Sequence, residues 1–215
     1  MGISLRDYTA REALKQIDRF LGGGAMNTVA CITAKKLAEA AKPDAVRELV
    51  ENTDLTICVE ADILEAAGIA SAGRIREIEE RIVLRECLRK VARSGGSVYL
   101  LGETEEKALA LEKTMSSLSS DLKVAGCAGY DSFEYLPERL MNALNEAAPQ
   151  IIFSRMTWPK DLELMHQCRK FLNAQLWFAL PDQELADTPK YSLFKNIRKI
   201  LFQKKVNEYN HGKTD

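Results

Sequence analysis

Short apolar segments alternate with longer helical segments along most of this chain, and this alternation limits its possible folds more than any other feature. Compact apolar runs such as 54–58 and 151–154 are separated by stretches in which apolar residues recur at helical spacing. Segments that alternate in this way form βαβ units, whose parallel strands build a sheet covered by helices on both faces. We therefore predict an α/β fold with a mostly parallel, Rossmann-like sheet.

The boundaries of the elements follow from the same pattern. The expected strands are residues 29–32, 54–58, 98–101, 123–126, 151–154 and 176–179. The main expected helices are residues 5–20, 34–41, 74–93, 105–118, 134–147 and 161–172, with Ser4 and Asp7 starting the first of them. The composition changes after Pro181, so we expect one α/β domain over residues 1–180 and a separate tail over residues 181–215.

The composition excludes several classes of protein. The net charge of −1 does not favour nucleic acid as a partner. No apolar run approaches the roughly 18 residues of a membrane-spanning helix, and the N-terminus lacks the pattern of a signal peptide. The five cysteines are widely spaced, which argues against a disulfide framework or a zinc site. We expect a cytoplasmic protein without a metal or a cofactor.

Polar side chains follow several of the expected strands, where α/β proteins bind their ligands. Glu60 and Asp62 follow the second strand and are candidates for a general base. The other candidates are ligand-binding residues after the third to fifth strands: Gly102, Thr104, Gly129, Tyr130, Arg155 and Lys160. A helix start after Gly102 suits an anion, and the two cations could neutralise a diphosphate. Each feature has a plainer alternative, because turns, helix caps and solvated charges give the same patterns.

Several motifs resemble those of the WecB/TagA/CpsF glycosyltransferases. The segment 97–130, SVYLLGETEEKALALEKTMSSLSSDLKVAGCAGY, is similar to the block of that family that runs from F-L-L-G-G to G-Y. Asn145, Pro149 and the run 151–153 match the next block, and Asp54-Leu55-Thr56-Ile57 matches its A-D-L-V-L strand. The matching segments cover about residues 28–180. The resemblance implies the α/β fold and a sugar-transfer activity.

The residues of the family's active site are only partly kept. The family strand that ends in Pro-Asp-Gly, with the Asp as base, ends here in Cys58-Val59-Glu60, so Glu60 or Asp62 would replace that base. Thr33 stands at the family's Asn, and Arg76 or Arg74 approximates its Arg. Of the signature G-L-G-x-P-K-Q-E only Pro159 and Lys160 remain, and Glu103 replaces the second Gly of L-L-G-G.

The resemblance leaves two main functions open. The first is an inverting, metal-independent transfer of an N-acetylhexosamine-type sugar from a UDP donor to a lipid-linked saccharide in cell-surface polysaccharide or teichoic-acid-type biosynthesis. Its partners would be the UDP-sugar and that acceptor. The second is a catalytically inactive paralogue that serves as a binding or scaffold subunit of the same pathway. A third and weaker alternative is an unrelated α/β sensor of a small metabolite.

The tail suggests a contact with the inner face of the cell membrane. Six basic residues lie between Lys190 and Lys205, and no acidic residue lies between Asp187 and Glu208. Apolar residues recur at helical spacing among them, which fits an amphipathic helix on an anionic membrane. The expected contact residues are Leu193, Phe194, Ile197, Arg198, Lys199 and Leu201. The alternative is a helix that packs on the domain with a solvated basic face.

The membrane hypothesis predicts that the full chain sediments with anionic vesicles and that truncation after Pro189 abolishes this binding. Each basic residue near the surface adds about 1 kcal/mol, so binding should weaken with salt while its apolar part persists. Co-sedimentation at several salt concentrations measures this. A full-length chain that stays in solution with anionic vesicles at low salt would favour the packed helix, and truncation should then lower the melting temperature.

Overall fold

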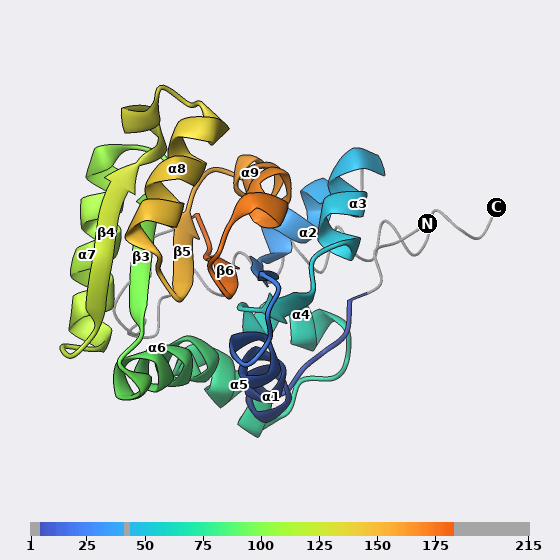
Figure 1. The fold of residues 1–215 in the computed structure, drawn as a ribbon. Coiled ribbons are helices and arrows are strands. Elements are labelled where there is room, and N and C mark those ends of the chain that lie inside the picture. Colours follow the sequence, from blue (N-terminus) through green and yellow to red (C-terminus); the bar gives the residue numbers. More distant parts are fainter. Residues whose placement is uncertain (1–4, 41–43, 183–215) are drawn as a thin grey trace.

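The computed structural model describes residues 5–40 and 44–182 and shows one six-stranded sheet in which all strands are parallel. The strands lie in the order β2-β1-β6-β5-β3-β4 (Figure 1). They are β1 (Asn27–Ile32), β2 (Leu55–Cys58), β3 (Ser97–Gly102), β4 (Lys123–Gly129), β5 (Ile151–Arg155) and β6 (Leu176–Ala179). The predicted fold class is confirmed, and every predicted strand is present with a boundary shift of three residues or fewer.

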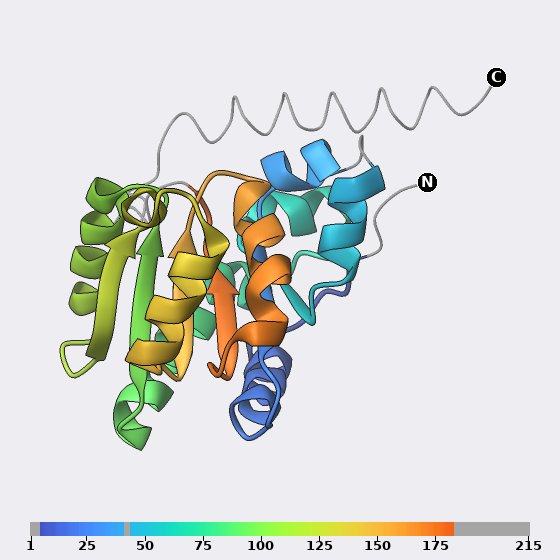
Figure 2. The ribbon, with the colours of Figure 1, turned by 45° about the horizontal axis from the view of Figure 1, so that its top comes forward.

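Helices cover both faces of the sheet (Figures 1 and 2). One face packs against α2 (Ala34–Ala40), α3 (Asp44–Glu51), α8 (Pro137–Ala147) and α9 (Lys160–Cys168). The other packs against α1 (Ala10–Leu21), α6 (Ile82–Ser94) and α7 (Glu105–Leu118). Neighbouring strand residues point to opposite faces, so Ile152 joins the first core and Ile151 and Phe153 the second. Burial on both faces explains the nearly unbroken apolar composition of the strands.

Several helix boundaries differ from the sequence prediction. The helix predicted over 134–147 begins at Pro137, and the one predicted over 161–172 ends at Cys168. The first helix begins after Thr9, not near Ser4, because Thr9 and Glu12 form a reciprocal capping box. The predicted helix 74–93 is two helices, α5 (Ala72–Glu79) and α6. Arg81 interrupts the predicted helix with a left-handed backbone (φ 52°), which residues other than glycine rarely adopt. The periodicity of apolar residues does not reveal such an interruption. A further short helix, α4 (Ala61–Ala66), follows β2.

All strands end at the same edge of the sheet because all pairs are parallel, and the arrowheads of β3 to β6 in Figure 2 point the same way. From this edge the chain after β3 crosses to the face of α7, whereas the chain after β5 crosses to the face of α9. Since β3 and β5 are neighbours, their loops diverge and leave a crevice between them. This edge is therefore where a ligand site is expected.

The expected C-terminal helix, with Leu193, Phe194, Ile197, Arg198, Lys199 and Leu201, lies outside the described residues. Within the described part of the chain, no helix has both the length and the apolar character needed to cross a membrane. The membrane contact of the tail therefore stays a prediction.

Two glycines let α7 start directly against the sheet. A Cβ on Gly102 would lie 2.3 Å from the backbone nitrogen of Ala108 and 2.7 Å from the carbonyl oxygen of Thr104. A Cβ on Gly129 would lie 2.2 Å from the backbone nitrogen of Glu105. Both glycines were expected to bind ligand, but the space beside each is filled by the backbone of α7 and its cap. Their first role is thus to bring helix and strands together.

This close approach predicts that Gly102→Ala destabilises the protein by about 3 kcal/mol or more, because the new methyl group meets backbone atoms that cannot move aside singly. Denaturant unfolding measures the change. Gly24→Ala is the matched control, since a Cβ there meets no atom within 4 Å and should change stability little. Equal stability of the two variants would contradict the packing described for α7.

Candidate functional site

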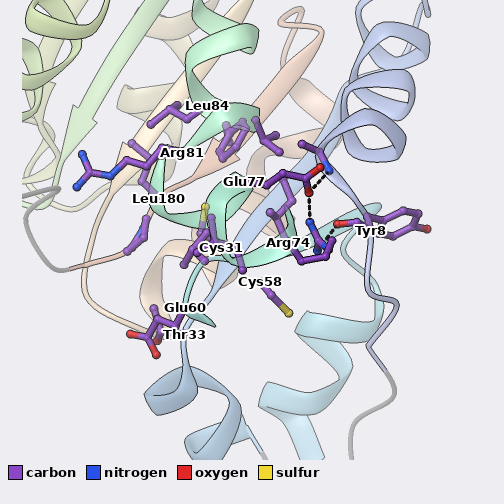
Figure 3. Close-up of a pocket in the computed structure, with 17 residues that line it drawn as sticks. Tyr8, Cys31, Thr33, Cys58, Glu60, Arg74, Glu77, Arg81, Leu84 and Leu180 are labelled. Atoms are coloured by element: carbon purple, nitrogen blue, oxygen red, sulfur yellow. Dashed lines mark hydrogen bonds and ion pairs between the residues drawn. The ribbon is translucent and has the colours of Figure 1, made fainter. Parts of the chain in front are cut away.

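A pocket opens where β1, β2 and β6 end, between the sheet edge and helices α5 and α6 (Figure 3). Its cavity volume is about 190 Å³. The inner wall is apolar and includes Ile57, Leu84 and Phe178, whereas the polar residues at its rim include Thr33, Glu60, Arg74, Glu77 and Arg81. We refer to this cavity as the Glu60 pocket. Its lining combines two glutamates and two arginines with an apolar wall.

Glu60 lies directly after β2 and precedes α4. Its Oε2 atom accepts a hydrogen bond of 2.8 Å from the backbone N–H of Ala34, at the start of α2. This bond fixes the carboxylate at the rim. The other carboxylate oxygen, Oε1, takes no part in the bond. Asp62 lies in the first turn of α4 and does not line the Glu60 pocket. Of the two acids expected at this strand end, the structure brings Glu60 to the cavity.

Thr33 follows β1 and lines the same pocket, although it is only 3% exposed. Its hydroxyl oxygen accepts a hydrogen bond of 3.2 Å from the backbone N–H of Lys36 and so caps α2. The structure thus brings Thr33 and Glu60 together at the start of α2, as expected from their places after neighbouring strands.

Of the two arginines that the family resemblance offered, Arg74 lines the pocket and Arg76 does not. Arg76 is exposed and pairs with Glu80 one helical turn away, at 2.6 Å. Arg74 pairs with Glu77 and with Asp7, and donates a hydrogen bond of 2.6 Å to the carbonyl oxygen of Tyr8. These contacts hold the segment before α1 against α5 (Figure 3). The sequence left both arginines open for this position, and helical spacing alone does not separate them.

Two cysteine thiols also line the Glu60 pocket. Burial raises the pKa of Cys31 to about 12 and that of Cys58 to about 11. A thiol with such a pKa is protonated at neutral pH and is a poor nucleophile. The cysteines therefore shape the wall and do not supply a reactive group.

The remaining expected residues lie at the ends of β3, β4 and β5. Thr104 caps α7, accepting from the N–H of Lys107 at 3.3 Å, and Arg155 is 4% exposed. Pro159 precedes α9, which starts at Lys160. Tyr130 and Lys160 line a second cavity of about 270 Å³, which also includes Glu103 and Tyr135. We refer to it as the Tyr130 pocket. Arg155 and the two glycines do not line either pocket.

Glu103 lines the Tyr130 pocket and pairs with two lysines, of which Lys160 also lines it. Its carboxylate lies 2.6 Å from Nζ of Lys107 and 3.5 Å from Nζ of Lys160, and it accepts a hydrogen bond from the hydroxyl of Thr157. Hydrogen bonds from Lys107 and Thr157 lower the pKa of Glu103 to about 2. The carboxylate is therefore ionised at neutral pH and already engages Lys160.

A buried ion pair that sequence reasoning missed lies at the same edge of the sheet. Lys36 and Asp161 are 1% and 0% exposed, with Nζ and Oδ2 3.5 Å apart. The ammonium group also donates to the carbonyl oxygen of Leu180 at 3.4 Å and lies 5.1 Å from the ring centre of Trp158. The pair joins α2, α9 and the end of β6. A lysine in a helical segment is usually solvated, so no sequence signal separates this one from its neighbours.

Comparison with known proteins gives a family match. Residues 1–180 match the model of the glycosyl transferase WecG/TagA/CpsF family. No curated protein matches the chain significantly. The matched residues include every described strand and all but one residue of the lining of the Glu60 pocket, Pro181.

The buried pair predicts a pH-dependent stability. Burial raises the pKa of Asp161 to about 6 from 3.8, so between these values the folded state binds more protons than the unfolded state. The free energy of unfolding should therefore fall as pH rises from about 4 to 6, by on the order of 3 kcal/mol, and this component should be constant above pH 7. The measurement is denaturant unfolding at several pH values.

The matched control is the double variant Lys36→Met/Asp161→Asn, which removes both charges and keeps an acceptor for the N–H of Leu162. The variant should lack this pH-dependent component. Subtracting its free energy of unfolding from that of the wild-type chain at each pH therefore isolates the component. The same pH dependence in both proteins would assign it to other groups.

Proposed function

The chain belongs to the WecG/TagA/CpsF glycosyl transferase family, and on this premise we propose that it transfers an N-acetylhexosamine-type sugar from a UDP donor to a lipid-linked saccharide. The family supports a role in cell-surface polysaccharide synthesis. One observation carries the proposal of catalysis: Glu60 lines a cavity at the sheet edge, which Thr33, Arg74 and Arg81 also line. A transferase needs a carboxylate at such a place, and the departure from the family's Asp does not remove it.

The proposed reaction is a direct displacement at the anomeric carbon. Glu60 accepts the proton of the acceptor hydroxyl while the oxygen of that hydroxyl bonds to the anomeric carbon. The bond from that carbon to the diphosphate oxygen breaks on the opposite side, so configuration inverts and UDP leaves with the electron pair. The hydrogen bond from Ala34 to Oε2 holds the carboxylate in place, and Oε1 receives the proton.

The guanidinium groups of Arg74 and Arg81 would provide positive charge near the departing diphosphate. Arg74 is partly neutralised by Asp7 and Glu77, which also fix its orientation. A guanidinium held in this way costs little reorganisation when charge develops. Arg81 presents its side chain from the left-handed turn before α6, a strained backbone of the kind that clusters at binding sites. The sequence also predicted donor contacts for Lys160, Thr104 and Arg155, but Lys160 already pairs with Glu103, which argues against its holding the diphosphate.

A second candidate function is a non-catalytic subunit of the same pathway, and Glu103 favours it. An ionised carboxylate stands where the family has a glycine, and it engages Lys160 of the remaining Pro-Lys pair. A diphosphate placed there would meet a like charge at short range. The basic tail would bring either protein to the membrane where lipid-linked acceptors reside.

The proposal predicts that Glu60→Gln lowers the rate of transfer by about 10²–10⁴-fold, because the amide cannot accept the proton. Release of UDP from UDP-N-acetylhexosamines, with a polyprenyl-diphosphate-linked saccharide as acceptor, measures the rate. Asp62→Asn is the matched control and should stay close to wild type, since Asp62 does not line the pocket.

Turnover that survives in the double variant Glu60→Gln/Asp62→Asn would contradict the assignment of the base. A wild-type chain that binds UDP but transfers no sugar would support the non-catalytic subunit instead.

A further inference from the structure

The Tyr130 pocket lies at the ends of β3, β4 and β5, apart from the carboxylate of Glu60. Its floor is formed by Met156 and Leu164, which are 1% and 4% exposed. Lys160, Glu163 and Gln167 rise from one face of α9, because residues three and four apart share a helix face. The pocket thus combines an apolar floor with a row of hydrogen-bonding side chains.

Two tyrosines form the opposite wall. Their rings meet edge to face with centroids 5.4 Å apart, and the hydroxyl of Tyr130 donates to the carbonyl oxygen of Tyr135 at 2.8 Å. Tyr135 is 55% exposed despite its size. It follows Glu134, and both residues have a left-handed backbone, with φ of 55° and 56°. Two such residues in succession cost stability, yet they present an aromatic face at the mouth of a cavity.

The charges of this pocket do not suit a diphosphate. Glu103 and Glu163 are acids, and the cation that lines the cavity, Lys160, already pairs with Glu103. Carboxylates, an amide and an ammonium group can instead accept from and donate to the hydroxyl groups of a neutral ligand. An aromatic ring can pack against the apolar face of such a ligand.

The size of the cavity points the same way. Its volume of about 270 Å³ lies just below the range of roughly 300–1,000 Å³ that is typical of sites for drug-sized ligands. This space suits one sugar ring better than a complete nucleotide sugar.

From these observations we propose that the Tyr130 pocket binds one neutral pyranose ring, which packs on Tyr135 and donates hydroxyl hydrogen bonds to Glu163 and Gln167. The binding site stands on its own geometry, and it rests on the proposed function only for the source of the sugar. That source is either the sugar of the donor or a sugar of the acceptor. The pocket would select a saccharide without touching the reacting bond.

The test is a titration of the ¹⁵N-labelled full chain with the methyl glycoside of N-acetylglucosamine, and separately with UDP, followed by NMR chemical shifts. The glycoside should shift signals of Tyr130, Glu163 and Gln167, and UDP alone should not. Tyr135→Ala and Gln167→Ala should each weaken glycoside binding about five- to tenfold, as loss of a stacking or hydrogen-bonding contact does. Tyr135→Phe should restore most of it.

Leu109→Ala is the matched control, because Leu109 is 53% exposed on α7 and does not line the pocket. It should leave binding unchanged. Shifts of these residues by UDP and not by the glycoside would overturn the proposal, as would glycoside binding that is indifferent to both alanine variants, or no binding at all.

The source of the sugar follows from competition with UDP-N-acetylglucosamine. If UDP-N-acetylglucosamine displaces the methyl glycoside, the pocket holds the sugar of the donor. If the two bind simultaneously, it holds a sugar of the acceptor. Both outcomes support a pyranose site. The titration needs no turnover, so its failure is distinguishable from a failure of Glu60 as the base.

Discussion

Parallel pairing of the strands is the constraint on which the rest of this structure depends. A parallel strand cannot return through a tight hairpin, so each strand from β1 to β5 is followed by a crossover that carries helix. The crossovers cover both faces and bring all carboxyl ends to one edge. Residues distant in sequence, such as Thr33, Glu60 and Tyr130, therefore lie along one edge of a single sheet. Both pockets follow from this arrangement.

The fold could be predicted because the signal is repeated along the chain. The strands β1, β3, β5 and β6 are buried on both faces, so each is an apolar run that is readable without knowledge of its neighbours. Errors arose where a single residue decides the local structure. Arg81 ends one helix and starts the next through its backbone conformation, and Thr9 displaces the expected cap through its bond with Glu12.

The site was less predictable, because its residues are defined by partners far away in sequence. Position after a strand was enough to find Glu60, Tyr130 and Lys160. It could not distinguish Arg74 from Arg76, since that difference depends on the segment before α1. Nor could it show that Lys36 is buried, because its partner Asp161 lies 125 residues further along the chain.

Besides Glu60, two positions of the family's motifs carry acids in this chain, and each of these two has an internal cation partner. Glu103 replaces a glycine and pairs with Lys107 and Lys160, while Asp161 stands at the family's glutamine and pairs with Lys36. A buried charge without a partner would cost several kcal/mol, so Asp161 and Lys36 depend on one another. These substitutions therefore form balanced local networks that are compatible with the fold.

Helix α5, which forms one wall of the Glu60 pocket, contains no buried residue. It is held to the segment before α1 by Arg74 and Glu77, through ion pairs and hydrogen bonds, and its link to α6 is the turn at Arg81. Lifting this helix away would expose little apolar surface, so it requires far less free energy than opening the sheet. The backbone amides of α5 should therefore exchange their hydrogens with solvent sooner than those of the sheet. Displacement of this one wall would thus open the Glu60 pocket while the strands and Glu60 stay in place.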